Sequence, residues 1–237
     1  MSLEFRNAVI TGLTRYPKRL SPKFFYDKRG SELFDQICDC PEYYFTRSEL
    51  GVLREHADEI AQALGDRTSL VEFGSGASRK TRVLLDHLPT LSAYVPIDIS
   101  EDFLLETSKR LSRDYPSLKI LPVVADFTQP LARIIEKLPN KNSRGKLAAF
   151  FPGSTIGNFH RDEAQRFLAR TAEFLGNAGA LLVGVDLNQD KRSLELAYDD
   201  RAGVTAAFNL NLLDRMRREL VAAVDSTLFR HHAVYNR

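Results

Sequence analysis

A pair of glycines and a distant acid have the types and spacing of a nucleoside-binding site. Gly74 and Gly76 lie in the segment EFGSGASRK, directly after the mainly apolar run 70–73. Glycines at this point permit a tight turn and let the backbone approach a ligand closely. Asp98 follows the next apolar run, 22 residues after Gly76, and an acid at that distance accepts hydrogen bonds from the ribose hydroxyls of an adenosine ligand. An ordinary structural turn and an aspartate before a helix are the plain alternatives.

Two further polar segments follow apolar runs in the same way. Asp126 and Phe127 come after the third run, where an acid can pair with an adenine amino group and an aromatic ring can stack on the base. The fourth run leads into the small-residue loop PGSTIGNF (152–159), where a substrate should meet the cofactor, unless the loop is a plain strand-to-helix connection. It is not the Asp/Asn-Pro-Pro-Tyr/Phe tetrapeptide of enzymes that methylate nucleic-acid bases, which argues against a base methylase.

Together these segments favour S-adenosylmethionine (SAM) over a nicotinamide dinucleotide. The dinucleotide fingerprint G-x-G-x-x-G would place its third glycine at position 79, which is Arg79. A pyrophosphate requires that glycine for close packing of the helix, whereas SAM has no phosphate and tolerates Ala77 and Ser78. An NAD-dependent oxidoreductase is the alternative from a different enzyme class.

Such a site needs a parallel sheet that brings the carboxyl ends of its strands to one edge. Short apolar runs predict five strands buried on both faces, over residues 70–73, 93–97, 118–124, 147–151 and 180–185. Helices are expected between them, namely one that Ser100 caps and that stops before Pro116, Leu131–Leu138 after Pro130, and Asp162–Leu175. This alternation is typical of a Rossmann-like α/β sheet with helices on both faces.

The flanks of this core are expected to be mainly helical. Thr46-Arg47-Ser48-Glu49 has the form of a capping box and predicts one helix from there to near Gly65. After the core, helices are expected around Lys191–Tyr198 and Thr205–Leu220, and the last strand-like piece is weak.

Composition bounds the remaining classes. Among 237 residues, 43% are hydrophobic, and 33 Lys+Arg against 31 Asp+Glu give no overall drive toward nucleic acid or an anionic membrane. No run approaches the roughly 18 apolar residues of a membrane span, and the start, Met1-Ser2-Leu3 onward, has no signal-peptide core. Cys38 and Cys40 indicate reduced thiols in a cytoplasmic protein, and the five histidines have no metal-binding spacing, so no metal is expected.

Five longer stretches are far more specific than a glycine turn. They are PKFFYDKRGSELFDQI, PEYYFTRSE, LVEFGSGASRKTR, GSTIGN and AYDDRAGVTAAFN, spread from Pro22 to Asn209. In these stretches the chain resembles the histidine-specific, SAM-dependent methyltransferase family, known from ergothioneine biosynthesis. The resemblance implies a class I methyltransferase fold with a SAM-binding core (68–187) and a helical substrate-binding lobe (1–67 and 188–237). It also implies methyl transfer to the α-amine of an amino acid, histidine in the family, to form trimethylhistidine.

The resemblance also implies roles for single residues. SAM contacts are implied for Gly74, Lys80, Asp98, Asp126 and Phe127, and amino-acid contacts for Tyr43, Asn158 and Tyr198, with Tyr26 beside the reacting amine. These roles make chemical sense, because Asn158 offers a donor and an acceptor to an amino-acid head group and tyrosine hydroxyls suit a carboxylate. Without the motifs, each tyrosine would be read as a half-buried packing aromatic.

The chain departs from the family's pattern at its C-terminal end. Family members continue beyond the HHAVYN-type segment into a further strand, with an acid that grips the substrate side chain, whereas this sequence stops at Arg237. We therefore expect a fragment or a truncated homologue that lacks the last strands of the sheet. A cofactor-binding but inactive chain and a methyltransferase for another small amine are the functional alternatives.

Overall fold

The fold is seen in a computed structural model, which describes residues 3–129, 146–188 and 190–235. The chain divides into two units, each of which is compact by itself. We call Phe45–Leu187 the sheet unit, and Met1–Tyr44 together with Asn188–Arg237 the helical unit. The division lies at residues 44/45, whereas the sequence analysis drew it near residue 67, so the segment 45–67 belongs with the sheet. The helix predicted over Leu131–Leu138 lies outside the described residues.

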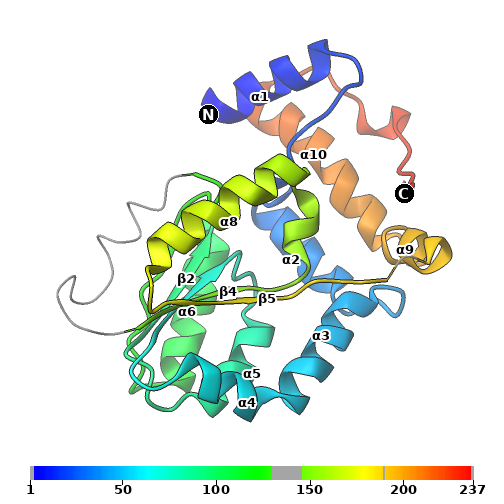
Figure 1. Ribbon diagram of the computed structural model, residues 1–237. Coiled ribbons are helices and arrows are strands. Elements are labelled where there is room, and N and C mark those ends of the chain that lie inside the picture. Colours follow the sequence, from blue (N-terminus) through cyan, green and yellow to red (C-terminus); the bar gives the residue numbers. More distant parts are fainter. Residues whose placement is uncertain (1–2, 130–145, 189, 236–237) are drawn as a thin grey trace. The chain divides into compact units, whose positions relative to one another are not determined.

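The sheet unit is built on five parallel strands in the order β3-β2-β1-β4-β5, which confirms the predicted Rossmann-like fold class (Figure 1). The strands are β1 (Ser69–Phe73), β2 (Ala93–Asp98), β3 (Val123–Val124), β4 (Leu147–Phe151) and β5 (Ala180–Val183). Because β1 is central and pairs with β2 and β4, the turn after β1 lies between the carboxyl ends of its two neighbours. In an open parallel sheet this is the place where ligands bind.

The central strands are buried on both faces, as their continuous apolar sequences predict. Side chains alternate along each strand, so Leu70 and Tyr94 contribute to one hydrophobic cluster and Val71 and Val95 to another. Helices cover both faces of the sheet, since α5 and α6 supply residues to the first cluster and α8 supplies Phe167 to the second. The helical elements that begin in or near this unit are α3 (Tyr44–Glu55), α4 (Ala57–Leu64), α5 (Arg79–His87), α6 (Glu101–Asp114), η2 (Thr155–Asn158) and α8 (Arg161–Leu175).

Helix α8 confirms the prediction made for residues 162–175. Its apolar face packs on the sheet, and Thr171, the one polar residue on that face, is fully buried. The Thr171 hydroxyl donates to the carbonyl of Phe167, 2.9 Å away, and is therefore satisfied within the helix.

Three local predictions for this unit need correction. The capping box at Thr46 is wrong, because α3 already begins at Tyr44 and the Glu49 side chain bonds elsewhere. The single helix predicted up to Gly65 is two helices that break at His56. Ser100 stands at the N-cap position of α6, but its side chain makes no capping hydrogen bond.

The third strand is shorter than predicted. Of the run 118–124, only Val123–Val124 pairs as a strand, with one isolated bridge between Ile120 and Tyr94. The Tyr94 N–H donates to the carbonyl of Lys119, so Pro96, two residues further along β2, faces the same run. Proline has no N–H to donate, and the ladder therefore lacks a hydrogen bond at this point.

The helical unit contains α1 (Leu3–Thr14), η1 (Pro22–Phe25), α2 (Lys28–Ile37), α9 (Lys191–Ala197), α10 (Val204–Leu220) and η3 (Ser226–Leu228). Its core is made by Phe5, Val9, Phe24, Leu212 and Met216. The helices predicted around 191–198 and 205–220 are confirmed. The weak strand-like piece at the end forms no strand over residues 221–235; a 3₁₀ turn, η3, lies there instead.

Candidate functional site

The glycine turn and Asp98 are joined directly by a hydrogen bond. Gly74 and Gly76 have φ of +71° and +49°, in the left-handed region that glycine tolerates. The Gly74 N–H donates to the carbonyl of Ile97 at 2.9 Å, and the Gly76 N–H donates to Asp98 Oδ2 at 3.0 Å. The two residues that the sequence paired at a distance of 22 positions therefore meet at the carboxyl ends of β1 and β2.

Both oxygens of Asp98 are held by backbone donors. Oδ1 accepts the N–H of Ser100 at 3.0 Å, while Oδ2 accepts that of Gly76. Burial raises the pKa of the Asp98 carboxyl, and these N–H groups act in the opposite direction by stabilising its charged form. Each carboxylate oxygen has a second lone pair, so the arrangement can still accept hydrogen bonds from a pair of hydroxyls.

Phe127 lies beside the glycine turn. A Cβ atom on Gly74 would stand 3.5 Å from the Phe127 ring, so the missing side chain leaves the ring next to the turn. The ring packs against Phe73 and Phe151, with centroids 6.0 and 5.6 Å away. Asp126, the preceding residue, accepts the N–H of Thr128 at 2.9 Å, which fixes its carboxylate in a short turn.

Lys80 stands in the first turn of α5 and pairs with an acid that the sequence analysis gave another role. Its Nζ lies 2.5 Å from Glu49 Oε2. The same carboxylate accepts the N–H of Gly153, at the start of the small-residue loop. Sequence reasoning missed Glu49 because the pattern Thr46 to Glu49 satisfied a local capping motif, although its place within PEYYFTRSE was a signal.

The small-residue loop after β4 is held by its own hydroxyls. Gly153 and Ser154 have φ of +81° and +55°. The Ser154 hydroxyl accepts the N–H of Asp186 at 3.0 Å, and the Thr155 hydroxyl donates to the carbonyl of Pro152 at 2.7 Å. Asn158 ends the 3₁₀ turn η2 and is exposed, so its amide can reach a ligand from this loop.

A buried acid under the glycine turn was also missed. Glu72, in β1, accepts hydrogen bonds from the hydroxyls of Thr81 and Tyr94. Burial raises its pKa from 4.5 to about 8, even though both hydroxyls and nearby Lys80 act to lower it. The signal was an acid within the otherwise apolar strand LVEF, because a buried carboxyl needs partners or must stay protonated.

The predicted substrate tyrosines all lie in the helical unit and are connected through rings. Tyr26 packs edge-on against Phe34 and Phe208, with both centroid distances 5.5 Å. Phe34 in turn contacts Tyr43, and Tyr43 contacts Tyr198, each at 6.1 Å. Tyr43 is 7% exposed and Tyr198 is 46% exposed, so the cluster runs from a buried ring to one that meets solvent.

A histidine that the sequence analysis did not use anchors Tyr198. His231 Nε2 lies 2.7 Å from the Tyr198 carbonyl, and its Nδ1 lies 3.0 Å from the amide nitrogen of Asn209. In this geometry Nε2 donates to the carbonyl and Nδ1 accepts from the Asn209 amide. His231 thereby ties its part of the chain to helix α10 and to the end of α9.

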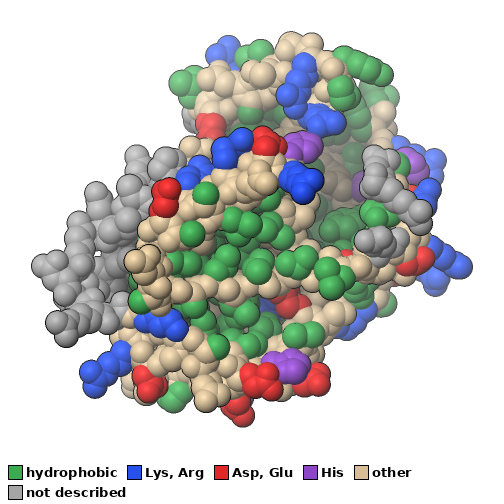
Figure 2. All heavy atoms as spheres, viewed as in Figure 1, with side chains coloured by type: hydrophobic (Ala, Val, Ile, Leu, Met, Phe, Trp, Pro, Cys, Tyr) green, Lys and Arg blue, Asp and Glu red, His purple; other side chains and the backbone are tan. Residues whose placement is uncertain are grey.

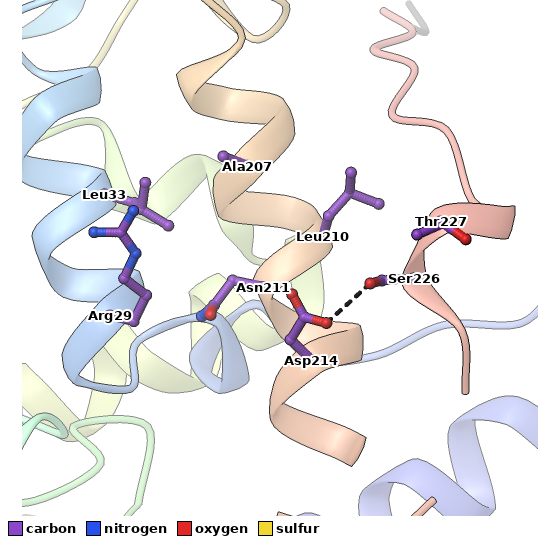
Figure 3. A pocket seen from close by; sticks show the side chains of 8 residues that line it. All are labelled: Arg29, Leu33, Ala207, Leu210, Asn211, Asp214, Ser226 and Thr227. Carbon is purple, nitrogen blue, oxygen red and sulfur yellow. Dashed lines mark hydrogen bonds between the residues drawn. The ribbon is translucent and has the colours of Figure 1, made fainter. Parts of the chain in front are cut away.

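Two hollows of the helical unit, within its described residues, are lined by none of the predicted site residues. One, of about 340 Å³, is open and lies between α2, α10 and η3 (Figure 3). Arg29 and Leu33 line it from α2, and Asp214, which accepts the Ser226 hydroxyl at 2.9 Å, lines it from α10.

Charge and metal-binding groups are unremarkable over the described part of the chain. On the face drawn in Figure 2, basic and acidic side chains are interspersed, in keeping with their nearly equal numbers. Within residues 3–129, 146–188 and 190–235, no cluster of His, Cys, Asp and Glu has the composition of a metal site. No helix in those same ranges is long and apolar enough to cross a membrane.

A glycine turn after β1, an acid ending β2 and a Rossmann-like parallel sheet define the class of nucleoside-cofactor α/β enzymes. Comparison with known proteins identifies the family. The sequence model of the family described as "Histidine-specific methyltransferase, SAM-dependent" matches residues 5–237. The chain therefore belongs to this family of SAM-dependent methyltransferases, and its cofactor is SAM.

Three curated relatives illustrate the range of this similarity. The chain is 44% identical to a histidine N-alpha-methyltransferase of Mycolicibacterium smegmatis, over 98% of this chain and 70% of that protein. It is 32% identical to ergothioneine biosynthesis protein 1 of Neurospora crassa, over 82% of this chain and 22% of that protein. It is 29% identical to 4-dimethylallyltryptophan N-methyltransferase easF of Claviceps purpurea, over 80% of this chain and 57% of that protein.

Proposed function

We propose that this protein transfers methyl groups from SAM to the α-amine of histidine, with trimethylhistidine as the final product. The observation that carries the proposal is the 44% identity, over 98% of the chain, to a protein named histidine N-alpha-methyltransferase. Similarity at this level extends through both units, so it includes the segments that contain Tyr26, Tyr43 and Tyr198.

The residues at the carboxyl edge of the sheet fit the cofactor. Asp98, with both oxygens oriented by backbone N–H groups, is proposed to accept the ribose hydroxyls. Gly74 and Gly76 let the backbone approach the ligand, because no side chain fills the space beside Phe127. Asp126 would accept the adenine amino group and Phe127 would stack on the base. Lys80 would bind the cofactor's carboxylate.

The helical unit supplies the proposed amino-acid contacts. Hydroxyls of Tyr43 and Tyr198 would donate to the substrate carboxylate, and the Asn158 amide of the sheet unit would contact the head group. Tyr26 would orient the reacting nitrogen from its place between Phe34 and Phe208. Each transfer adds one methyl group and leaves the nitrogen cationic. The faces of aromatic rings such as that of Tyr26 stabilise a positive charge of this kind.

The chemistry then depends mainly on position. When bound, SAM supplies an electrophilic methyl group on a sulfonium. The amine must be neutral to attack, and its proton passes to water or to a nearby carboxylate before the new C–N bond forms. Holding a neutral amine in line with its target can contribute several kcal/mol, up to about 7–11 in ideal cases, without a metal or a covalent intermediate.

The proposal is tested by incubating the full chain with SAM and histidine and following products by mass spectrometry. We expect mono-, di- and trimethylhistidine. When the methyl group of SAM is deuterated, these products should contain the deuterium. A chain that binds S-adenosylhomocysteine in a calorimeter but methylates no histidine would refute the proposed acceptor while leaving the cofactor intact. That result would also be expected for a cofactor-binding, inactive chain.

A different amine is the second candidate acceptor. It is favoured by the 29% identity to a protein named for N-methylation of 4-dimethylallyltryptophan, which has the same type of α-amine on a larger side chain. Competition decides between the two, since a better acceptor suppresses histidine methylation when both are present. We also propose a cytoplasmic location, because Cys38 and Cys40 lie two positions apart, a spacing that does not suit a disulfide between distant segments.

A further inference from the structure

We infer that Glu49 is a positioning residue of the cofactor site, which holds Lys80 and the loop after β4 in one arrangement. The inference rests on the proposed function, because it takes Lys80 as the partner of the cofactor's carboxylate. Nothing in the family resemblance or in the names of the relatives assigns Glu49 a role.

Glu49 makes three contacts with groups far away in the sequence. Its Oε1 and Oε2 accept the N–H of Gly153 at 3.0 and 2.8 Å, across 104 positions. Its Oε2 also lies 2.5 Å from the Nζ atom of Lys80. The carboxylate therefore connects helix α3, the first turn of α5 and Gly153, the second residue of the small-residue loop.

The contact is not an ordinary surface ion pair. The side chains of Glu49 and Lys80 are each only 16% exposed. Exposed pairs between flexible side chains contribute little, whereas a shielded pair must be fully hydrogen-bonded to offset the loss of hydration. The Gly153 N–H provides that additional bond for the carboxylate.

A fourth segment closes the space around the carboxylate. Gly184 follows β5, and a Cβ atom built on it would stand 1.9 Å from Glu49 Oε1. No side chain fits at that position while Glu49 keeps its place. Segments after β4 and β5 thus both shape the slot in which the carboxylate lies, beside the edge of the sheet where the cofactor is proposed to bind.

The arrangement determines what Lys80 can do. An ammonium group has three donors on a flexible stem, and Glu49 uses one of them. The carboxylate fixes the position of the ammonium group and leaves donors for a second anion. The same bond to Gly153 fixes the start of the loop that ends at Asn158. Glu49 thereby couples the position of the proposed carboxylate-binding lysine to the conformation of a proposed substrate-binding loop.

The experiment compares two ligands that differ in the part Lys80 is proposed to bind. S-adenosylhomocysteine has the amino-acid carboxylate, whereas 5′-methylthioadenosine lacks it. Calorimetry on the full chain gives the dissociation constant of each ligand for Glu49→Gln, which keeps an oxygen for the Gly153 N–H but loses the charge. We expect a Kd for S-adenosylhomocysteine about 10-fold higher and a Kd for methylthioadenosine within about twofold of wild type.

Two variants sharpen this comparison. Gly184→Ala should reproduce the same pattern, because the new Cβ expels the carboxylate while leaving Glu49 in the chain. Glu55→Gln, which changes an exposed acid in the same helix, is the matched control and should leave the dissociation constants of both ligands unchanged. Methylthioadenosine binding serves as the measure of an intact fold for every variant.

The outcomes separate the inference from the proposal beneath it. If Lys80→Gln leaves the ratio of the two dissociation constants unchanged, the proposed role of Lys80 fails. If Lys80→Gln changes the ratio of the two dissociation constants but Glu49→Gln does not, Lys80 keeps its role and the inference about Glu49 is overturned. Equal weakening of both ligands by Glu49→Gln and Gly184→Ala, or tighter binding of S-adenosylhomocysteine, would also overturn it.

Discussion

The sheet unit and the helical unit hold several of their candidate site residues by different physical means. In the sheet unit, the carboxylates of Asp98 and Glu49 are fixed by backbone N–H groups at 2.8–3.0 Å, donated by Gly76, Ser100 and Gly153. In the helical unit, the rings of Tyr26 and Tyr43 are fixed by edge-on contacts with their neighbours at 5.5–6.1 Å. The two acids of the sheet unit are thus held by directed polar bonds, whereas the two tyrosines of the helical unit are held by ring packing.

This difference suits the two proposed ligands, which are SAM for the sheet unit and the amino acid for the helical unit. A hydrogen bond to a charged group is directional and is worth about 1.5–3 kcal/mol, so it reads the fixed pattern of hydroxyls on a ribose. A ring contact is worth about 0.5–1.5 kcal/mol and tolerates small shifts, which suits an amine that gains methyl groups. Substitutions should therefore have large, ligand-specific effects in the sheet unit and smaller, graded effects in the helical unit.

The largest effect on ligand binding is expected for Asp98→Ala. The change removes the proposed acceptor of the ribose hydroxyls and leaves the N–H groups of Gly76 and Ser100 without their partner. With two bonds to a charged group lost, we expect the Kd of S-adenosylhomocysteine to rise about 100-fold by calorimetry. Asp102→Ala, an exposed acid in the next helix, should bind like wild type. An Asp98→Ala variant that binds within threefold of wild type would contradict the ribose assignment.

A second prediction concerns pH and the buried acid of the sheet unit. Burial raises the pKa of Glu72 to about 8, with Asp98 acting in the same direction and Lys80 against it. The folded state therefore binds a proton that the unfolded state releases above pH 4.5. The resulting stability is complete below that pH and is lost as the pH rises toward 8, by about 3–5 kcal/mol in total.

Denaturant unfolding at several pH values measures this loss. Glu72→Gln, an uncharged side chain of the same shape, should flatten the decline in unfolding free energy between pH 4.5 and 8. Glu106→Gln, which changes an exposed acid, should keep the wild-type decline. An unchanged slope in Glu72→Gln would mean that this carboxyl is not the group that titrates.

The parts of the fold that follow from short-range patterns were predictable from the sequence. Largely apolar runs located the central strands, because a strand buried on both faces carries few polar residues; Glu72 in β1 is an exception that two hydroxyls satisfy. The pairing of Gly76 with Asp98 was also predictable, since the order of a parallel sheet brings the ends of successive strands together. The fold class and the cofactor edge of the sheet therefore needed no knowledge of tertiary contacts.

The errors come from residues whose partners are distant in the sequence. Glu49 satisfied a capping pattern with Thr46, but its actual partner Gly153 lies 104 positions away, and no local motif reports such a contact. The run 118–124 looked like a full strand, yet Pro96 on the neighbouring strand removes a donor from the ladder. Tyr43 and Tyr198 were singled out through their motifs alone and stay predictions, because ring packing leaves no signature in spacing.

The smallest effect is expected in the ring cluster of the helical unit. Phe34 contacts Tyr26, Tyr43 and Phe208, so Phe34→Leu removes three ring contacts, two of them with proposed substrate tyrosines, while keeping most of the apolar volume. At about 0.5–1.5 kcal/mol for each contact, the KM for histidine should rise about 10-fold. The Kd of S-adenosylhomocysteine should not change, because the proposed ribose acceptor, Asp98, is fixed by polar bonds within the sheet unit. Phe5→Leu, which changes a core residue of α1, is the control for lost stability. It should leave the KM for histidine unchanged at a temperature where both variants are folded. If Phe34→Leu raised the Kd of S-adenosylhomocysteine as much as the KM for histidine, the proposed assignment of cofactor binding to one unit and substrate binding to the other would be wrong.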